Sequence, residues 1–240
     1  MKILDDLLST LRQGEVVVDI RQGPFQTAVL TQSCGLAATP HEYTNHQDNT
    51  PVKGAGTMIG KGALEVAKMA YSTSLFEAAI GMATINSLID VDEACCVSLN
   101  ARELLADEGR GKVVALIGHF PFAAELRQRV KKLWVIEQNP REGDFTESEG
   151  QKIIPEADVV GITGMAFTNH TIEHLLSLCH PRAYVIVLGG TAPLSPVIFD
   201  YGVDAISGTS VVDAEAVLHS VSQGATFRQV KGIRLLTMKR

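Results

Sequence analysis

The second half of the chain repeats one hydrophobic pattern four times. Each repeat is a short run rich in Val, Ile and Leu without polar alternation, followed by a loop of small or polar residues and then by helical sequence. The runs cover residues 113–118, 133–137, 158–164 and 184–190. Unbroken apolar runs are typical of strands covered on both faces of a parallel sheet. Their alternation with helices predicts βαβ crossovers and a Rossmann-like parallel-sheet domain.

The first half has a different pattern, in which short β-rich segments precede helices. Gln22-Gly23-Pro24 reads as the turn of a hairpin,. The predicted elements are a helix over 3–12, strands over 15–21, 25–31 and 33–38, and helices over 63–71 and 75–89,. The last helix is almost wholly apolar, so we expect it to be buried. The chain is therefore predicted to be an α/β protein, with an N-terminal α+β domain over residues 1–105 and a Rossmann-like domain over residues 106–240.

Composition and charge narrow the class of protein. The apolar content of 45% and the charged content of 20% are ordinary for a soluble globular chain,. No stretch approaches the ~18–20 continuous apolar residues of a membrane span, and early acids leave no room for a signal peptide. The net charge of −6, without a basic patch, argues against a nucleic-acid partner,. We expect a cytoplasmic protein whose four cysteines, which include no CxxC pair, form no disulfide,.

Open parallel sheets bind ligands at the carboxyl ends of their strands, so the loops after the four runs are the candidate site. The first loop contains Gly118, His119, Phe120 and Pro121, and Pro121 suits the first turn of a helix,. His119 is a candidate ligand contact or general acid/base; the alternative is a loop histidine that caps backbone groups. Only one glycine stands where a dinucleotide fingerprint has three. NAD is therefore disfavoured, whereas a nucleotide-like or adenosyl-like ligand stays open.

The second loop begins with an acid. Glu137 ends the second run, 19 residues after Gly118, and Gln138 follows it. A carboxylate at this position can accept hydrogen bonds from both hydroxyls of a ribose-like ring. The alternative is a solvated acid at the start of the loop. We expect Glu137 to contribute to ligand binding or to acid/base chemistry.

The third and fourth loops add small and polar residues. Thr163 and Gly164 end the third run, and Asn169 and Thr171 either cap the following helix or face the ligand,. The fourth loop is Gly189-Gly190-Thr191, in which two glycines allow close backbone approach and the threonine can bind an oxyanion,.

A polar, glycine-rich segment over residues 39–62 interrupts the first half. A loop of this length is usually functional or disordered. It contains His41 and His46, with Glu42 and Asp48 nearby, and these side chains could hold a metal. Their spacing matches no standard site, so a solvated polar loop is the favoured interpretation.

Several segments, in this order and spacing, resemble the bacterial and archaeal proteins described as the "putative heavy-metal chelation" family. They are Gly-Pro-Phe-Gln-Thr-Ala-Val at 23–29, Ile-Gly-Met-Ala-Thr-Ile-Asn at 80–86, Glu137, Ala-Asp-Val-Val at 157–160, Thr-Gly at 163–164, Asn-His-Thr-Ile-Glu at 169–173 and Phe-Asp-Tyr-Gly-Val-Asp at 199–204. One departure is Gly189-Gly190-Thr191, where Gly-Pro-Ser/Thr is expected.

The resemblance implies an enolase N-terminal-like domain followed by a Rossmann-like domain, with a site between them lined by the strand-end loops. It also implies the condensation or hydrolysis of pterin-, flavin- or siderophore-like chelator precursors, or the handling of metals. In an enzyme, His119 and Glu137 would be the acid/base candidates and Asn169 a polar orienter. The alternative is a non-catalytic binder or carrier of a metal–chelate complex. A homodimer is expected from base rates alone.

Overall fold

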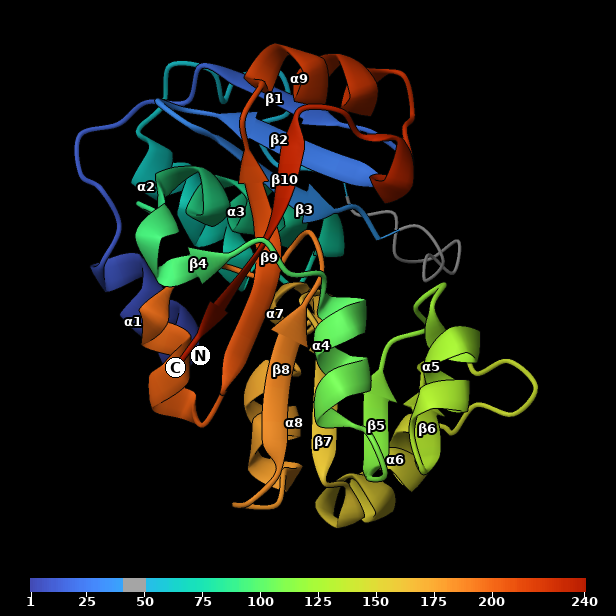
Figure 1. The fold of residues 1–240 in the computed structure, drawn as a ribbon. Coiled ribbons are helices and arrows are strands. Elements are labelled where there is room, and N and C mark those ends of the chain that lie inside the picture. The colour runs from blue at the N-terminus through green and yellow to red at the C-terminus, as the bar shows by residue number, and fades with distance from the viewer. Residues whose placement is uncertain (41–50) are drawn as a thin grey trace.

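The computed structural model describes residues 1–40 and 51–240, which form two β-sheets with helices packed around them (Figure 1). The small sheet is antiparallel and has the order β1 (Asp19–Gln22), β2 (Gln26–Leu30), β3 (Cys34–Ala38). It lies between two helices: α3 (Leu75–Leu88) packs on β2 and β3, and α9 (Ala214–Ser222) packs on β1 and β2. The predicted hairpin and third strand are confirmed.

The large sheet has seven strands in the order β4-β10-β9-β8-β7-β5-β6. The five from β9 to β6 are parallel, and β10 and β4 are antiparallel to their neighbours. Four of the parallel strands coincide with the predicted apolar runs, which confirms the parallel-rich α/β fold class. Their bounds are β5 (Val113–Ile117), β6 (Lys132–Ile136), β7 (Val159–Thr163) and β8 (Tyr184–Leu188); the remaining strands are β4 (Cys96–Val97), β9 (Ala205–Val211) and β10 (Ile233–Lys239).

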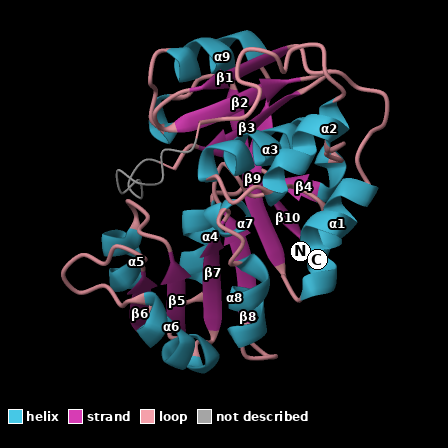
Figure 2. Cartoon of the chain, turned by 180° about the vertical axis from the view of Figure 1, so that it is seen from behind, coloured by secondary structure: helices cyan, strands magenta, loops and turns pink. Residues whose placement is uncertain are grey.

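Helices cover both faces of the large sheet (Figure 2). Alternate residues of β5 separate into two apolar clusters: Val114 and Leu116 pack with Leu104 and Leu126 on one face, whereas Ala115 belongs to the cluster on the other. The first face carries α4 (Ala101–Glu108) and α5 (Ala123–Arg129), and the second carries α6 (Glu147–Ile153), α7 (Met165–Thr168) and α8 (Ile172–Leu178). Such double coverage explains why these strands lack polar alternation.

The remaining helical segments connect or brace the two sheets. Among them, α1 packs against η4, so the N-terminus lies beside the second half of the chain (Figure 1). Their bounds are α1 (Lys2–Ser9), α2 (Ala63–Ala67), η1 (Lys68–Tyr71), η2 (Glu93–Cys95), η3 (Ile154–Glu156), η4 (Pro196–Tyr201) and η5 (Phe227–Gln229). No helix among the described residues has the length and apolar character needed to cross a bilayer.

The strand order places a switch point between β5 and β7. From β5 the chain crosses to β6 on one side, and the following strand, β7, lies on the other side of β5. Connections that leave in opposite directions open a crevice outside the carboxyl ends of the two strands. The crevice lies beside Gly118 and Thr163. The division of the chain into two domains at residue 105 stays a prediction. Helix α9, which comes from the second half of the chain, packs on the small sheet of the first half.

Glycine at two positions lets backbone segments of the first half approach closely. A Cβ on Gly81 of α3 would lie 1.9 Å from the backbone nitrogen of Ala70 in η1. A Cβ on Gly35 of β3 would lie 2.1 Å from the carbonyl oxygen of Ala83. These contacts are with backbone atoms, so the neighbour cannot rotate away.

We therefore expect Gly81→Ala to lower the free energy of unfolding by about 3 kcal/mol or more, because the added methyl group overpacks the contact with η1. Gly62→Ala is the matched control, because nothing lies within 4 Å of its added Cβ; its cost should be below about 1 kcal/mol. Urea unfolding of both variants measures the difference. Equal stability of the two variants would contradict the packing described here.

Glu77 is a buried acid in the first turn of α3. It is 5% exposed, and its carboxylate accepts hydrogen bonds from the Ser72 hydroxyl at 2.5 Å and from the Lys53 backbone N–H at 2.7 Å. The bond from Ser72, followed by that from Lys53, lowers the pKa of Glu77. The charged form is therefore the one that the fold stabilises.

Glu77→Gln should destabilise the protein by about 1–2 kcal/mol at pH 7, because it removes a charged acceptor. A lowered folded-state pKa contributes stability that is present above the unfolded pKa and lost as the pH falls through the folded value. Urea unfolding between pH 6 and pH 3 should thus show a shallower acid dependence for Glu77→Gln than for the wild type. The exposed Glu65→Gln is the control; if it flattens the profile as much as Glu77→Gln, the assignment is wrong.

Candidate functional site

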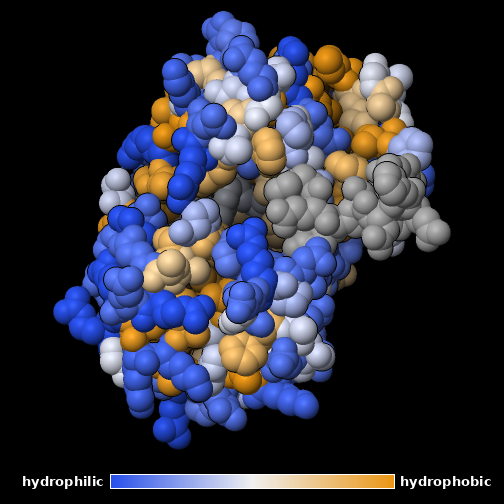
Figure 3. Space-filling view, turned by 90° about the vertical axis from the view of Figure 1, so that its right-hand side faces the viewer, coloured by the Kyte–Doolittle hydropathy of each residue, from blue (hydrophilic) through white to orange (hydrophobic). Residues whose placement is uncertain are grey.

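A cavity of about 330 Å³ lies at the switch point, at the carboxyl ends of β5, β6 and β7. Side chains from α6, α7 and α8 form one side of it, and Ala38–Pro40, at the end of β3, closes it from the small sheet. Figure 3 shows the face of the molecule on the α5 and β6 side, where apolar residues are exposed among hydrophilic ones. We call the space at the switch point the first cavity. It lies where the sequence predicts a site, at the ends of the strands and next to the first half of the chain.

Gly118 lets the tips of β5 and β7 approach each other. Its φ is +104°, and its N–H donates to the carbonyl oxygen of Ile136 at 2.9 Å. A Cβ on Gly118 would lie 3.1 Å from the Cβ of Thr163. Positive φ and close packing are the two conditions that favour glycine over other residues. Gly118 therefore shapes the floor of the first cavity.

Glu137 holds the tips of β5 and β6 together. Its Oε2 accepts the backbone N–H of His119 and its Oε1 accepts that of Gln138, both at 2.8 Å. Charge-assisted bonds to backbone N–H groups fix a carboxylate more firmly than solvent does. The Glu137 carboxylate is therefore held in the wall of the first cavity by backbone N–H groups. Its predicted contact with a ligand stays a prediction.

His119 forms a hydrogen-bonded pair with Asp144. Its Nδ1 lies 2.9 Å from Oδ2 of Asp144, which also accepts the backbone N–H of Arg141 at 3.1 Å. The Asp144 side chain is 3% exposed and that of His119 27%. Because a carboxylate only accepts, Nδ1 carries the proton of this bond, and in the neutral form of the ring Nε2 offers a lone pair. Sequence reasoning missed Asp144, because nothing in the sequence shows that the loop after β6 returns to His119.

Asn169 and Thr171 also line the first cavity, from the connection between α7 and α8. Oδ1 of Asn169 accepts the hydroxyl of Thr171 at 2.7 Å and its N–H at 3.3 Å. The prediction that Asn169 or Thr171 caps the following helix is therefore wrong. Neither side chain accepts an N–H from α8, because the bonds of Asn169 end at Thr171, one residue before the helix begins. The side chain of Asp213, by contrast, caps α9 by accepting the N–H of Ala216. Pro121 also differs from expectation, since α5 begins at Ala123 and Pro121 lies in the preceding turn.

The remaining predicted site residues line a second cavity of about 930 Å³, lying across the ends of β7, β8 and β9. Phe120 and Thr163 belong to both cavities, together with Ala38 and Met165. The structure thus divides the predicted set in two. The first cavity has Gly118, His119, Glu137, Gln138, Asn169 and Thr171, and the second has Pro121, Gly164, Gly189, Gly190 and Thr191.

Thr191 joins the two halves of the molecule. It is 1% exposed, and its Oγ1 accepts the backbone N–H of Ala38 at 2.9 Å. The side-chain amide of Asn86 donates to the carbonyl oxygens of both Leu36 and Thr191, at 2.9 and 3.2 Å. The Thr191 hydroxyl, predicted to bind an oxyanion, is therefore engaged in fixing β3 onto the loop after β8.

Groups of three or more His, Cys, Asp or Glu side chains that could hold a metal ion do not occur in residues 1–40 and 51–240. The four cysteines are free thiols. The candidate metal segment with His41, Glu42, His46 and Asp48 lies outside the described residues.

We expect Glu137→Ala to lower the free energy of unfolding by about 1–3 kcal/mol, because two backbone N–H groups lose a charged acceptor. Amide hydrogen exchange at His119 and Gln138 should accelerate at the same time. Glu142→Ala, an exposed acid in the same loop, should leave both measurements unchanged. If Glu137→Ala behaves like Glu142→Ala, the carboxylate does not hold these tips.

Comparisons with known proteins agree with this architecture. A family model described as "putative heavy-metal chelation" matches residues 100–239, and a second model with the same description matches residues 4–89. An uncharacterised protein of Methanocaldococcus jannaschii is 25% identical over 228 residues, which cover 89% of this chain and 85% of that protein.

Two solved structures share the fold. A protein of unknown function from Desulfitobacterium hafniense superposes with a TM-score of 0.84 at 23% identity, covering 100% of this chain and 97% of that one. One from Pyrococcus horikoshii, also of unknown function, has a TM-score of 0.82 at 21% identity, covering 99% of this chain and 100% of that one. The first family model alone spans more than half of the chain, so the chain belongs to the family described as "putative heavy-metal chelation".

Proposed function

We propose that this protein is an enzyme that hydrolyses, or in the reverse direction condenses, a small chelator-like molecule in the first cavity. The observation that carries the proposal is that His119, which lines the cavity, is hydrogen-bonded to Asp144. A histidine oriented by a carboxylate is a common form of general acid/base. Hydrolysis and condensation both need such a group, because each moves a proton to or from oxygen or nitrogen.

The hydrogen bond within the pair supports this role. Asp144 holds the Nδ1–H of His119, so the lone pair of Nε2 is available to a substrate,. Nε2 would take a proton from the attacking water as its oxygen bonds to the substrate carbonyl or imine carbon. The imidazolium would then return that proton to the leaving nitrogen or oxygen. Asp144 is almost fully buried, which favours persistence of the bond that sets the tautomer,.

Other polar residues in the first cavity support binding and positioning. Glu137 fixes the backbone of His119, so its proposed role is to position the base. Asn169 and Thr171 offer a side-chain amide and a hydroxyl near the same space. A volume of about 330 Å³ is within the range of small-ligand sites, and polar side chains supply many of the groups that line it,.

The family description favours a metal-chelating molecule, or its precursor, as the substrate class. The second candidate function is non-catalytic binding of a finished metal–chelate complex. It draws on the same description and would use the same polar lining without turnover. The two functions differ in what His119 does after binding.

The test begins with mass spectrometry and metal analysis of native protein, to find any copurifying molecule. Turnover is then measured with that molecule and with ester and amide conjugates of catechol and hydroxamate chelators. His119→Gln should reduce turnover by about 10²–10⁴-fold while changing ligand affinity only a few-fold. Asp144→Asn should reduce turnover as well, because it favours the wrong tautomer of His119.

His219→Gln, at an exposed position on α9, is the matched control and should behave as wild type. Loss of turnover without loss of binding in His119→Gln supports the enzyme. If the protein binds an intact chelate tightly without reaction, and His119→Gln leaves that affinity unchanged, the enzyme proposal is wrong and the non-catalytic binder takes its place.

A further inference from the structure

The second cavity has the size and lining of a ligand site in its own right. Its volume of about 930 Å³ lies within the range of small-molecule and cofactor sites,. It opens on the other side of the β7 tip from the first cavity, against the start of α4, the turn before α5, and η5. None of its lining residues other than Ala38, Phe120, Thr163 and Met165 takes part in the first cavity.

Gln26 is the strongest sign of a missing partner. It lies on β2 of the small sheet, lines the second cavity, and is 5% exposed. Its Oε1 is buried and has no hydrogen-bond partner among the described residues. A buried amide oxygen without a partner destabilises a fold, so native structures rarely retain one without a reason. A ligand with an N–H or O–H donor would satisfy this oxygen.

Aromatic side chains form flat walls in the same cavity. The rings of Phe120 and Phe122 stack with centroids 5.2 Å apart and planes 27° apart. Phe227 of η5 lies against the backbone of Gly190, where a Cβ would be 2.8 Å from its Cε2. Aromatic faces around an apolar space favour a flat ring as the ligand.

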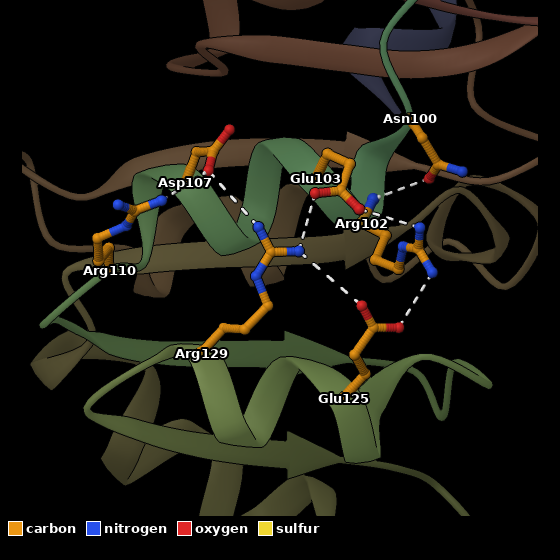
Figure 4. Close-up of polar contacts among 7 residues, drawn as sticks. All are labelled: Asn100, Arg102, Glu103, Asp107, Arg110, Glu125 and Arg129. Atoms are coloured by element: carbon orange, nitrogen blue, oxygen red, sulfur yellow. Dashed lines mark hydrogen bonds and ion pairs between the residues drawn. The ribbon is translucent and has the colours of Figure 1, made fainter.

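Two arginine side chains line the second cavity and are candidate partners for an anionic group of a ligand. Arg102 lines the cavity, but its two terminal guanidinium nitrogens are engaged by Glu103 at 2.9 Å and by Glu125 at 3.0 Å (Figure 4), which leaves only the buried Nε without a partner among the described residues. Arg228 also lines it, is exposed, and has no ion pair with another residue in the part of the chain that the structure describes. Arg228 is therefore the arginine available to a ligand.

The wall that carries Phe120 and Phe122 is held in place by a charge network. Arg129 of α5 bonds Glu103 of α4 at 2.8 Å and also lies 3.6 Å from Asp107 (Figure 4). With the Arg102 pairs, this network joins α4 to α5 beside the cavity, which Arg102 itself lines. The cavity is thus bounded by elements that are tied together without a ligand, as expected of a preformed site.

From these observations we infer that the second cavity binds a flat aromatic, anionic ligand. A donor on the edge of its ring bonds Oε1 of Gln26, its ring lies along Phe120, Phe122 and Phe227, and its anionic group pairs with Arg228. The inference does not rest on the proposed function, because binding in the second cavity needs no reaction at His119.

A direct test uses 8-anilinonaphthalene-1-sulfonate, which carries aromatic rings, one N–H donor and a sulfonate. Fluorescence titration of the wild type should give saturable binding of one probe per chain. Gln26→Leu keeps the side-chain volume and removes the acceptor, so the Kd should rise about 5–10-fold. Arg228→Gln should raise the Kd about 3–10-fold and reduce its dependence on salt.

Matched controls separate this site from general apolar binding. Gln223→Leu and Arg127→Gln change the same residue types at exposed positions that line neither cavity, and both should leave the Kd unchanged. Naphthalene-1-sulfonate lacks the donor, so it should bind more weakly to the wild type and be insensitive to Gln26→Leu. His119→Gln should not alter probe binding, which distinguishes failure at the first cavity from failure at the second.

Gln26→Leu should also resist urea better than the wild type in the absence of probe, because it removes a buried group without a partner. The inference is overturned if the probe binds all variants equally, or if both probes respond alike to Gln26→Leu. Absence of saturable binding to the wild type would overturn it too.

Discussion

The structure depends on one seam of hydrogen bonds, where β3 of the small sheet meets the loop after β8. Thr191 accepts the N–H of Ala38, and Asn86 donates to carbonyl oxygens on both sides of the seam. These groups are largely removed from water, so each bond that is lost would leave a polar atom without a partner. The seam fixes how the small sheet sits above the strand ends. Ala38, whose N–H takes part in the seam, lines both cavities, and Thr191 lines the second.

The topology of the large sheet explains why the spaces lie there. The switch between β5 and β7 separates the following loops, and the small sheet covers the resulting crevice without filling it,. Gly118 and Gly164 let the tips approach closely: a Cβ on Gly164 would lie 2.5 Å from the backbone nitrogen of Ala192. Phe120, Thr163 and Met165 remain as the partition between the cavities. Two ligands bound at once would therefore be neighbours.

Much of this arrangement was predictable from the sequence, for identifiable reasons. Strands β5 to β8 are buried on both faces, and burial of that kind leaves unbroken apolar runs. Strands β9 and β10 were not predicted, because Ser207 and Gly208 interrupt the first and Arg234 the second. His119 and Glu137 could be chosen as candidates because a residue directly after a parallel strand has a known place at the sheet edge.

The other contributions depend on tertiary packing and leave no local signal. Asp144 reaches His119 only through the path of the loop after β6, and Thr191 is turned toward β3 by the docking of the small sheet. The face on which Gln26 lies follows from α9 and α3 covering the small sheet from opposite sides. Sequence patterns specify the elements more strongly than they specify how two units meet.

A crystal structure of the native protein with its copurified or added ligand would show directly where the ligand binds. We expect ligand density between the tips of β5, β6 and β7, in contact with His119. Density confined to a surface distant from the seam, or strand-end spaces filled by the protein's own side chains, would contradict it.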